Sequence, residues 1–253
     1  MKVLAVIPAR LGATRLPNKP LRLIGGVPLV TRVWERVSAL GLADQVVVAT
    51  DAPEILDVVQ RAGGVAVPTR SDHPSGTDRV AEVARLDAYA GYDAIVNVQG
   101  DEPFVQPEAV GGALAMVREH GYALGTAAAP ADPAMFADPN VVKVVCASDG
   151  RAMYFSRAPI PWCRDASDAA EHAGLVRQHI GVYAYRREAL LQWVTLPPHP
   201  LERVERLEQL RALAAGLAMG VALVDTPPER GVDTEADLAR ANARWADLNA
   251  GRS

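Results

Sequence analysis

Cysteine is scarce in this chain of 253 residues, which contains only Cys146 and Cys163. The two lie too far apart for a CxxC motif, and there is no further cysteine to complete a zinc cage. The chain is therefore expected to fold without disulfides, and a reducing cytoplasm is the expected compartment. With 49% hydrophobic and 22% charged residues, the composition is that of a soluble globular protein.

Long hydrophobic runs are also missing. The longest uncharged apolar stretch, residues 212–224, has 13 residues and contains Gly216 and Gly220. A membrane-spanning helix needs about 20 such residues. The N-terminal segment MKVLAVIPAR is interrupted by Pro8 and Arg10 and lacks the cleavage site of a signal peptide. Neither membrane insertion nor a leader peptide is expected.

An excess of positive charge is lacking as well. The chain has 26 Lys and Arg against 30 Asp and Glu, which gives a net charge of −4. A protein that binds nucleic acid through its whole surface is normally basic, so nucleic acid is not an expected partner. Any phosphate group that the chain binds must be met by a local cluster of cations.

Short β-branched runs alternate with longer helical patterns in the first half of the chain. Strands are expected at residues 3–7, 45–49, 64–68 and 94–98, and helices at 29–40, 53–62 and 77–89. This alternation predicts an α/β fold with a doubly wound, mostly parallel sheet. In such sheets ligands bind beyond the carboxyl ends of the strands, so the polar residues that follow the strands are the candidate site.

The pattern becomes less regular after Asp132. Strands are expected at 141–146, 152–155, 180–185 and 221–224, with a long helix at 201–217 and a closing helix at 235–248 capped by Asp233 or Thr234. We expect a single α/β domain over 1–253, in which residues about 132–217 form a smaller antiparallel substrate lobe.

The loop after the first strand carries three cations, Arg10, Arg15 and Lys19, within ten residues. Gly12 and Thr14 add flexible backbone and a hydroxyl, so the loop suits a triphosphate. It contains neither the GxxxxGK[ST] of a P-loop nor a GxGxxG fingerprint, which argues against P-loop ATPases and dehydrogenases. The alternative is a solvated basic loop.

The second candidate segment is His73-Pro74-Ser75-Gly76-Thr77-Asp78-Arg79, a turn followed at once by a helical pattern. Its small residues would let a base or ribose approach the backbone, with Arg79 directed into the same crevice. A plain helix-capping turn explains Ser75, Gly76 and Thr77 equally well.

Two carboxylates follow strands elsewhere. Asp101 comes directly after a buried strand and Gly100, and Asp233 follows a later strand. One or two carboxylates together with substrate phosphates are the usual ligands of Mg²⁺. Each aspartate taken alone is explained as a strand-to-helix turn, but both together with the cationic loop favour a metal-phosphate centre.

Further candidates come from the second half of the chain. Arg157 has the fork geometry that reads a carboxylate, and His179 is either a donor or a satisfied structural residue. The charged helix around 202–211 is expected to be solvated or subunit-facing, with Glu208 and Gln209 as exceptions.

Taken together, these motifs resemble those of the 3-deoxy-manno-octulosonate (KDO) cytidylyltransferase family, over nearly the whole chain. The residues that carry the resemblance are Ile7-Pro8-Ala9-Arg10 with the loop to Pro20, Ser75-Gly76-Thr77-Asp78-Arg79, Gln99-Gly100-Asp101-Glu102-Pro103, Phe155-Ser156-Arg157, His179-Ile180-Gly181, Leu207-Glu208-Gln209-Leu210-Arg211 and Gly231-Val232-Asp233-Thr234. The loop Leu11-Gly12-Ala13-Thr14 varies the family pattern by one extra glycine.

The resemblance implies transfer of a cytidylyl group from CTP to the anomeric hydroxyl of KDO, giving CMP-KDO and pyrophosphate for lipopolysaccharide biosynthesis. It implies Mg²⁺ as cofactor and a homodimer formed by the later lobe. The implied site comprises Ala9, Arg10, Thr14, Arg15 and Lys19 at the triphosphate, Ser75 and Gly76 at the cytidine, Arg79 near the junction of the substrates, Asp101 and Asp233 at the metal, and Gln99, Arg157, His179, Tyr183 and Glu208 at the sugar acid. Arg10, Arg15, Lys19 and Asp101 are the implied catalytic residues.

Two other functions stay open at this point. One is a cytidylyltransferase for another acidic sugar, of the 8-amino-KDO or sialic acid type, which would differ only in its pocket. The other is a non-catalytic nucleotide-sensing module. The presence of Arg10, Lys19, Asp101 and Asp233 argues against a sensor, because binding alone does not need paired metal carboxylates.

Overall fold

The computed structural model describes residues 1–12 and 15–250 and divides into two compact units. One, here called the split unit, comprises residues 2–105 and 229–253. The other, the inserted unit, comprises residues 106–228 together with Met1. The lobe predicted at 132–217 lies within the inserted unit.

The split unit is built on a parallel sheet of four strands in the order β5-β4-β1-β6. The strands are β1 (Val3–Ala9), β4 (Gln45–Thr50), β5 (Val65–Pro68) and β6 (Ala94–Asn97), and every pair among them is parallel. The β-branched side chains of β1, β4 and β6 are buried, which is typical of a parallel sheet covered by helices, whereas Val65 of the edge strand β5 is exposed. All four strands were expected from the sequence, and the predicted fold class is confirmed.

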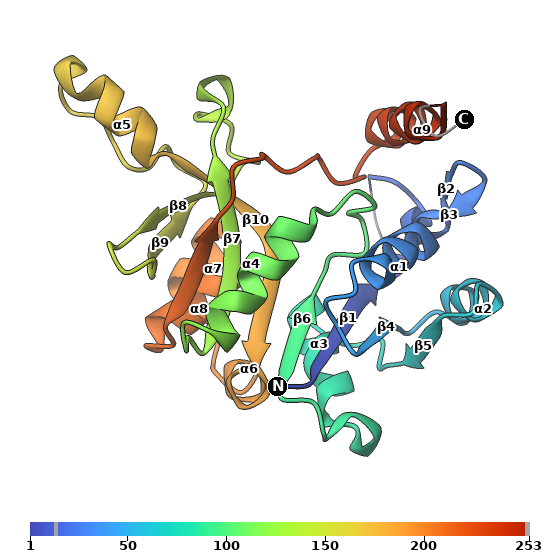
Figure 1. Ribbon diagram of the computed structural model, residues 1–253. Helices are drawn as coiled ribbons and strands as arrows, with labels where there is room; N and C mark the ends of the chain where they lie inside the picture. The colour runs from blue at the N-terminus through green and yellow to red at the C-terminus, as the bar shows by residue number, and fades with distance from the viewer. Residues whose placement is uncertain (13–14, 251–253) are drawn as a thin grey trace. The chain divides into compact units, whose positions relative to one another are not determined.

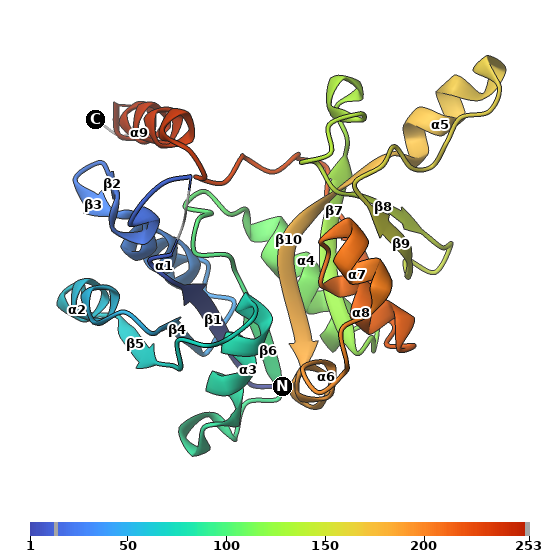
Figure 2. The same cartoon turned by 180° about the vertical axis from the view of Figure 1, so that it is seen from behind.

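Helices cover both faces of this sheet. The helices α1 (Leu29–Ala39) and α2 (Pro53–Arg61) contact each other on one face, and α3 (Gly76–Arg85) lies on the opposite face, as Figures 1 and 2 show. The expected helix 77–89 ends four residues early because Leu86 is extended, and a 3-10 turn (Asp87–Tyr89) follows. A second 3-10 turn (Lys19–Leu21), the hairpin of β2 (Leu23–Ile24) and β3 (Val27–Pro28), and α9 (Glu235–Ala250) complete the unit.

The inserted unit combines parallel and antiparallel strands. Strand β7 (Leu124–Pro130) pairs parallel with β11 (Met219–Leu223) and antiparallel with β10 (Arg177–Arg186). Strands β8 (Lys143–Cys146) and β9 (Ala152–Ser156) extend β10 in antiparallel fashion, as predicted. Helix α4 (Pro107–Arg118) packs on β7 so closely that a Cβ at Gly125 would lie 2.1 Å from the carbonyl oxygen of Ala113.

The remaining elements of this unit are short: the 3-10 turns Pro133–Met135 and Ala166–Asp168, and the helices α5 (Ala169–Leu175), α6 (Arg187–Trp193), α7 (Pro200–Glu205) and α8 (Gln209–Ala214). The single helix expected at 201–217 is wrong, because Arg206 adopts a left-handed conformation with φ of 54° and separates α7 from α8. Both cysteines are free thiols. Within the described part of the chain, no helix is both long and apolar enough to cross a bilayer.

Candidate functional site

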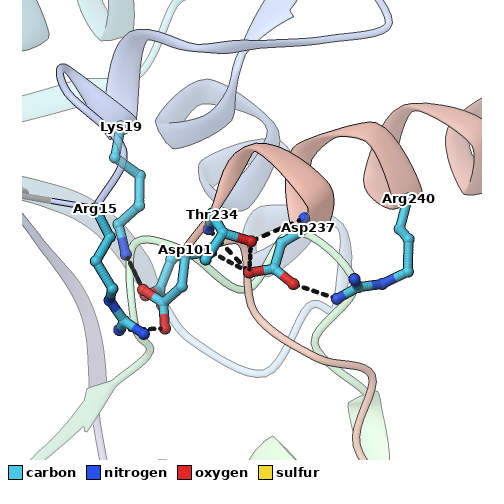
Figure 3. Close-up of polar contacts among 7 residues, drawn as sticks. Arg15, Lys19, Asp101, Thr234, Asp237 and Arg240 are labelled. Carbon is cyan, nitrogen blue, oxygen red and sulfur yellow. Dashed lines mark hydrogen bonds and ion pairs between the residues drawn. The ribbon is translucent and has the colours of Figure 1, made fainter.

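Lys19 lies at the centre of a charged cluster in the split unit. Its ammonium donates to Asp101 Oδ2 at 2.6 Å and to Asp233 Oδ1 at 2.9 Å, and Arg15 contacts Asp233 Oδ2 at 3.1 Å (Figure 3). Burial alone would lower the pKa of Lys19, but attraction to Asp101 and Asp233 and the hydrogen bonds to them outweigh burial and raise it. Lys19 is therefore positively charged throughout the physiological pH range.

Glycines bring the chain segments of this cluster together. A Cβ at Gly100 would lie 2.8 Å from the carbonyl oxygen of Pro8, so only glycine lets β6 continue into Asp101 this close to the end of β1. The segment before α9 lies against Asp101, because Val232 N donates to the Asp101 carbonyl oxygen at 2.9 Å. At Gly231, a Cβ would lie 3.4 Å from the same oxygen.

The cap of α9 leaves Asp233 available to Lys19. Thr234 Oγ1 accepts from Asp237 N at 3.2 Å, and Asp237 Oδ2 accepts from Asp233 N at 3.1 Å and from Thr234 N at 2.8 Å (Figure 3). Of the two caps expected from the sequence, Thr234 is the one that the structure uses. Because Thr234 satisfies the helix end, the carboxylate of Asp233 is directed to Lys19 and Arg15 instead.

Glu102 differs from its neighbour Asp101. Burial, with a further contribution from the charge of Asp101, raises the pKa of Glu102 to about 8, so this carboxyl is protonated at neutral pH. The carboxylates in contact with Lys19 are those of Asp101 and Asp233. In residues 1–12 and 15–250 no group of three or more His, Cys, Asp or Glu is arranged to hold a metal. Two carboxylates are a ligand set that fits Mg²⁺, which is usually bound by one or two protein carboxylates together with substrate phosphates and water.

The turn before α3 is both a helix cap and a neighbour of β1. Ser75 Oγ accepts from Asp78 N at 3.2 Å and donates to Asp78 Oδ2 at 2.7 Å, so the capping interpretation of this segment is confirmed. A Cβ at Gly76 would lie 3.5 Å from Pro8 Cγ, which places the turn beside the end of β1.

Arg79 is buried at the carboxyl ends of two strands. Its guanidinium contacts Asp51 Oδ1 at 2.8 Å and donates to Thr69 Oγ1 at 2.5 Å. Asp51 follows β4 and Thr69 follows β5, so Arg79 ties both strand ends to α3. Its predicted place near the junction of two substrates stays a prediction.

The remaining candidates of the split unit, two for the triphosphate and one for the sugar acid, lie at or after the ends of β1 and β6. Ala9 is the last residue of β1, Arg10 follows it and is exposed, and Gln99 follows β6. Thr14 lies outside the described residues. Every described candidate for phosphate, cytidine and metal therefore belongs to the split unit.

Most of the sugar-binding candidates belong to the inserted unit: Arg157, His179, Tyr183 and Glu208. His179 contacts Thr126 Oγ1 at 2.9 Å through a ring nitrogen and packs edge-on against Phe155, with ring centroids 4.9 Å apart. The ring centroid of Tyr183 lies 5.5 Å from that of His179. Burial lowers the pKa of His179 to about 3, so its imidazole is neutral at physiological pH.

Arg157 is surrounded by backbone acceptors. Its guanidinium donates to the carbonyl oxygens of Glu205 at 2.7 Å, Pro139 at 2.9 Å and Arg206 at 3.3 Å. Glu208 occupies the N-cap position of α8, two residues after Arg206.

Two partners of Arg157 were missed in the sequence. The Glu205 carboxylate accepts from Ser156 Oγ at 2.5 Å and from Arg157 N at 2.9 Å. Lys143 is fully buried and donates to the carbonyl oxygens of Val141, Arg157 and Asp138, at 2.5, 2.6 and 3.0 Å. A lysine within the apolar run Val141–Cys146 was the one signal available in the sequence, because a buried ammonium needs several acceptors.

Comparison with known proteins shows the family of the chain. A family model described as cytidylyltransferase matches residues 4–221, and a match over most of the chain defines it as a nucleotidyltransferase. A 3-deoxy-manno-octulosonate cytidylyltransferase from Gemmatimonas aurantiaca is 61% identical over 253 residues, which cover 100% of this chain and 98% of that protein. The chain belongs to the 3-deoxy-manno-octulosonate cytidylyltransferase family.

Solved structures agree with this assignment. The structure of a CMP:2-keto-3-deoxy-manno-octonic acid synthetase complexed with CTP is 40% identical and has a TM-score of 0.90, covering 98% of this chain and 100% of that one. A cytidylyltransferase from Leptospira borgpetersenii is 15% identical with a TM-score of 0.61, covers 98% of this chain and 87% of that one, and shares the fold.

Proposed function

We propose that the chain transfers the cytidylyl group of CTP to the anomeric hydroxyl of KDO with Mg²⁺, and that the CMP-KDO formed in the cytoplasm serves lipopolysaccharide biosynthesis. The observation that supports this site chemistry best is the contact of one lysine ammonium with two carboxylates, at 2.6 and 2.9 Å, beside the loop after β1. The name of the relative that is 61% identical supports the choice of substrates.

The triphosphate is assigned to the loop after β1. Arg10 is exposed, and the side chain of Arg15 is 66% exposed, so both can turn toward an anionic ligand. Ala9, Thr14 and Lys19 complete this set, while Ser75 and Gly76 offer the cytidine a close approach to the backbone before α3. Three cations offset much of the charge of a triphosphate.

The metal is assigned to Asp101 and Asp233. A bound Mg²⁺ would neutralise phosphate charge and act as a template for the reacting groups. Lys19, which lies between the two carboxylates and carries a positive charge, neutralises charge on the phosphates from the protein side. With the phosphate charge offset by Lys19 and the metal, the approach of the attacking oxygen to the α-phosphorus would meet less electrostatic repulsion.

The reaction exchanges one bond to phosphorus for another. The anomeric hydroxyl oxygen of KDO attacks the α-phosphorus in line, the bond from that phosphorus to the bridging oxygen breaks, and pyrophosphate leaves. The hydroxyl proton passes to solvent. The work of Arg10, Arg15 and Lys19 is positioning and charge stabilisation, which dominate catalysis of such transfers.

The sugar acid is assigned to Gln99, Arg157, His179, Tyr183 and Glu208. Because the His179 imidazole is neutral, its contribution is a hydrogen bond rather than a charge. The homodimer is assigned to the inserted unit, where Val204 is 83% and Trp162 77% exposed. Large apolar side chains exposed to this degree are typical of protein interfaces.

Pyrophosphate release from CTP with Mg²⁺ tests the proposal, measured with and without KDO and with UTP and a sialic acid as controls. Release that needs both CTP and KDO is the expected result. Release with CTP and another acidic sugar would reassign the pocket of Arg157 and His179, whereas no release with any acceptor would favour a nucleotide-sensing module.

A further inference from the structure

The connection between β5 and α3, residues 69–75, contacts α3 at its start, in its middle and at its end. At its start, Thr69 Oγ1 accepts from Arg79 at 2.5 Å. In its middle, Glu82 Oε2 accepts from Arg70 N at 3.1 Å and contacts the Nε2 atom of His73. At its end, Ser75 binds Asp78. We call residues 69–75 the β5–α3 loop.

The contact between Glu82 and His73 is shielded from water. The His73 side chain is only 11% exposed and that of Glu82 is 26% exposed. Burial alone would raise the pKa of Glu82, but the hydrogen bonds from His73 and Arg70 N outweigh burial and lower it, so the carboxylate is ionised at neutral pH. A hydrogen bond to a charged and partly buried group is stronger than one between neutral groups.

Glu82 and Arg79 are three positions apart on α3 and therefore lie on neighbouring turns of one face. Arg79 holds the beginning of the β5–α3 loop, and Glu82 holds its middle. The loop ends at Ser75, and the next residue, Gly76, lies beside Pro8 near the end of β1. Any reorientation of this turn would break contacts to a charged group.

We propose that Glu82 and His73 are positioning residues for the nucleotide: they hold the β5–α3 loop so that the Ser75-Gly76 turn is already shaped for the cytidine of CTP. This inference rests on the proposed function, which assigns Ser75 and Gly76 to the nucleotide. When a turn is ordered only part of the time, the apparent Kd equals the intrinsic Kd divided by the fraction of molecules in which the turn is in place.

A matched control exists in the same loop. The guanidinium of Arg70 donates to both carboxylate oxygens of Asp72, at 2.9 and 2.6 Å, and both side chains are more than half exposed. This ion pair links two side chains of the loop to each other. Asp72→Asn therefore removes a carboxylate of the loop while the contacts of Glu82 stay intact, and its KM for CTP is expected to equal that of the wild type.

The test compares Glu82→Leu, Glu82→Gln and His73→Gln with Asp72→Asn, by steady-state kinetics and by calorimetric titration with CTP. For Glu82→Leu we expect Kd and KM for CTP to rise roughly tenfold while kcat at saturating CTP and KM for KDO stay within about twofold. Glu82→Gln keeps an acceptor for Arg70 N, so its KM for CTP should lie between those of wild type and Glu82→Leu. If Glu82→Leu fails to fold, His73→Gln and Glu82→Gln carry the comparison.

An unchanged KM for CTP in folded Glu82 and His73 variants would overturn the inference, as would an equal loss in kcat and in both KM values. Gly76→Val separates this result from a failure of the proposed function, because its side chain would occupy the turn itself. If Gly76→Val raises KM for CTP and the Glu82 variants do not, only the positioning role is wrong. If Gly76→Val also has no effect, the turn does not bind the nucleotide, and both assignments fall.

Discussion

At the scale of single residues, Lys19 determines the charge of the site. Two aspartates held near each other repel, and the ammonium between them offsets that repulsion at distances of 2.6 and 2.9 Å. Because Lys19 contacts both aspartates, loss of the charge of either one changes the electrostatic balance around the ammonium.

Asp101→Asn removes one of these charges and leaves the shape of the side chain. We expect the variant to fold and to lose at least about a hundredfold in kcat, because charge stabilisation by the paired carboxylate site would be lost. Turnover and the midpoint of thermal unfolding are measured together, with Asp72→Asn as the control for the same change at an exposed position. A kcat equal to that of the wild type would remove Asp101 from the metal site.

His179 predicts a pH dependence of stability. Its pKa is about 3 in the folded chain against an ordinary value of 6.5, so between these values the unfolded chain binds the proton and the folded chain does not. The free energy of unfolding therefore falls as pH decreases through this window, by about 2 kcal/mol from pH 7 to pH 5 for this one group.

Urea unfolding at pH 7 and pH 5 measures this effect. In His179→Gln the loss of stability between the two pH values should be smaller than in the wild type by that amount. His120→Gln, which changes an exposed histidine, should retain the wild-type difference. Equal pH dependence in all three proteins would show that folding does not lower the pKa of His179.

A single residue could be predicted from the sequence only where the residues next to it in the chain indicate its role. Lys19, Asp101 and Asp233 stand in segments whose residue types suit phosphate or metal, so the sequence singled them out, and the structure brings them into contact. Glu205 binds Arg157 across 48 positions, and no local pattern pairs these two residues. Glu82 was missed for a similar reason, because a glutamate within an amphipathic helix looks like part of a solvated face.

At the scale of elements, the strands of the split unit could be predicted and β7 could not. Strands β1, β4 and β6 are runs of Val and Ile, whose side chains favour a pleated buried surface. Strand β7 reads LGTAAAP, in which Gly, Ala and Pro, residues that are depleted in strands, predominate. The backbone of α4 lies against Gly125, so a side chain there would clash with α4. This need for a small residue comes from tertiary packing and leaves no local sequence pattern.

The break between α7 and α8 also escaped prediction, because arginine favours helices. Arg206 has φ of 54°, a conformation that costs about 1 kcal/mol or more for a residue with a Cβ. We expect Arg206→Gly to raise the free energy of unfolding by up to about 1 kcal/mol. Arg203→Gly, within α7, should lower it by a similar amount. Urea midpoints of the two variants check this, and destabilisation by both would show that the Arg206 side chain contributes more than its backbone costs.

At the scale of the whole molecule, the proposed homodimer makes a prediction about mass in solution. Val204 is 83% exposed on α7 of the inserted unit, and burying a glutamate at such a position in an interface would be costly. Light scattering after gel filtration should give twice the chain mass for the wild type and the mass of one chain for Val204→Glu. Leu86→Glu, at an exposed position of the split unit, should remain dimeric. A dimeric Val204→Glu would place the interface elsewhere.

The split unit is assembled from two stretches of chain, residues 2–105 and 229–253, and this order has a consequence for biosynthesis. A ribosome releases residues 2–105 first, then all of residues 106–228, and only afterwards Asp233 and α9. During that interval Asp101 is the one carboxylate of the pair that Lys19 can reach. All residues of the inserted unit, among them the proposed sugar-acid candidates Arg157 and His179, are therefore synthesised and available for folding before the split unit has its last helix.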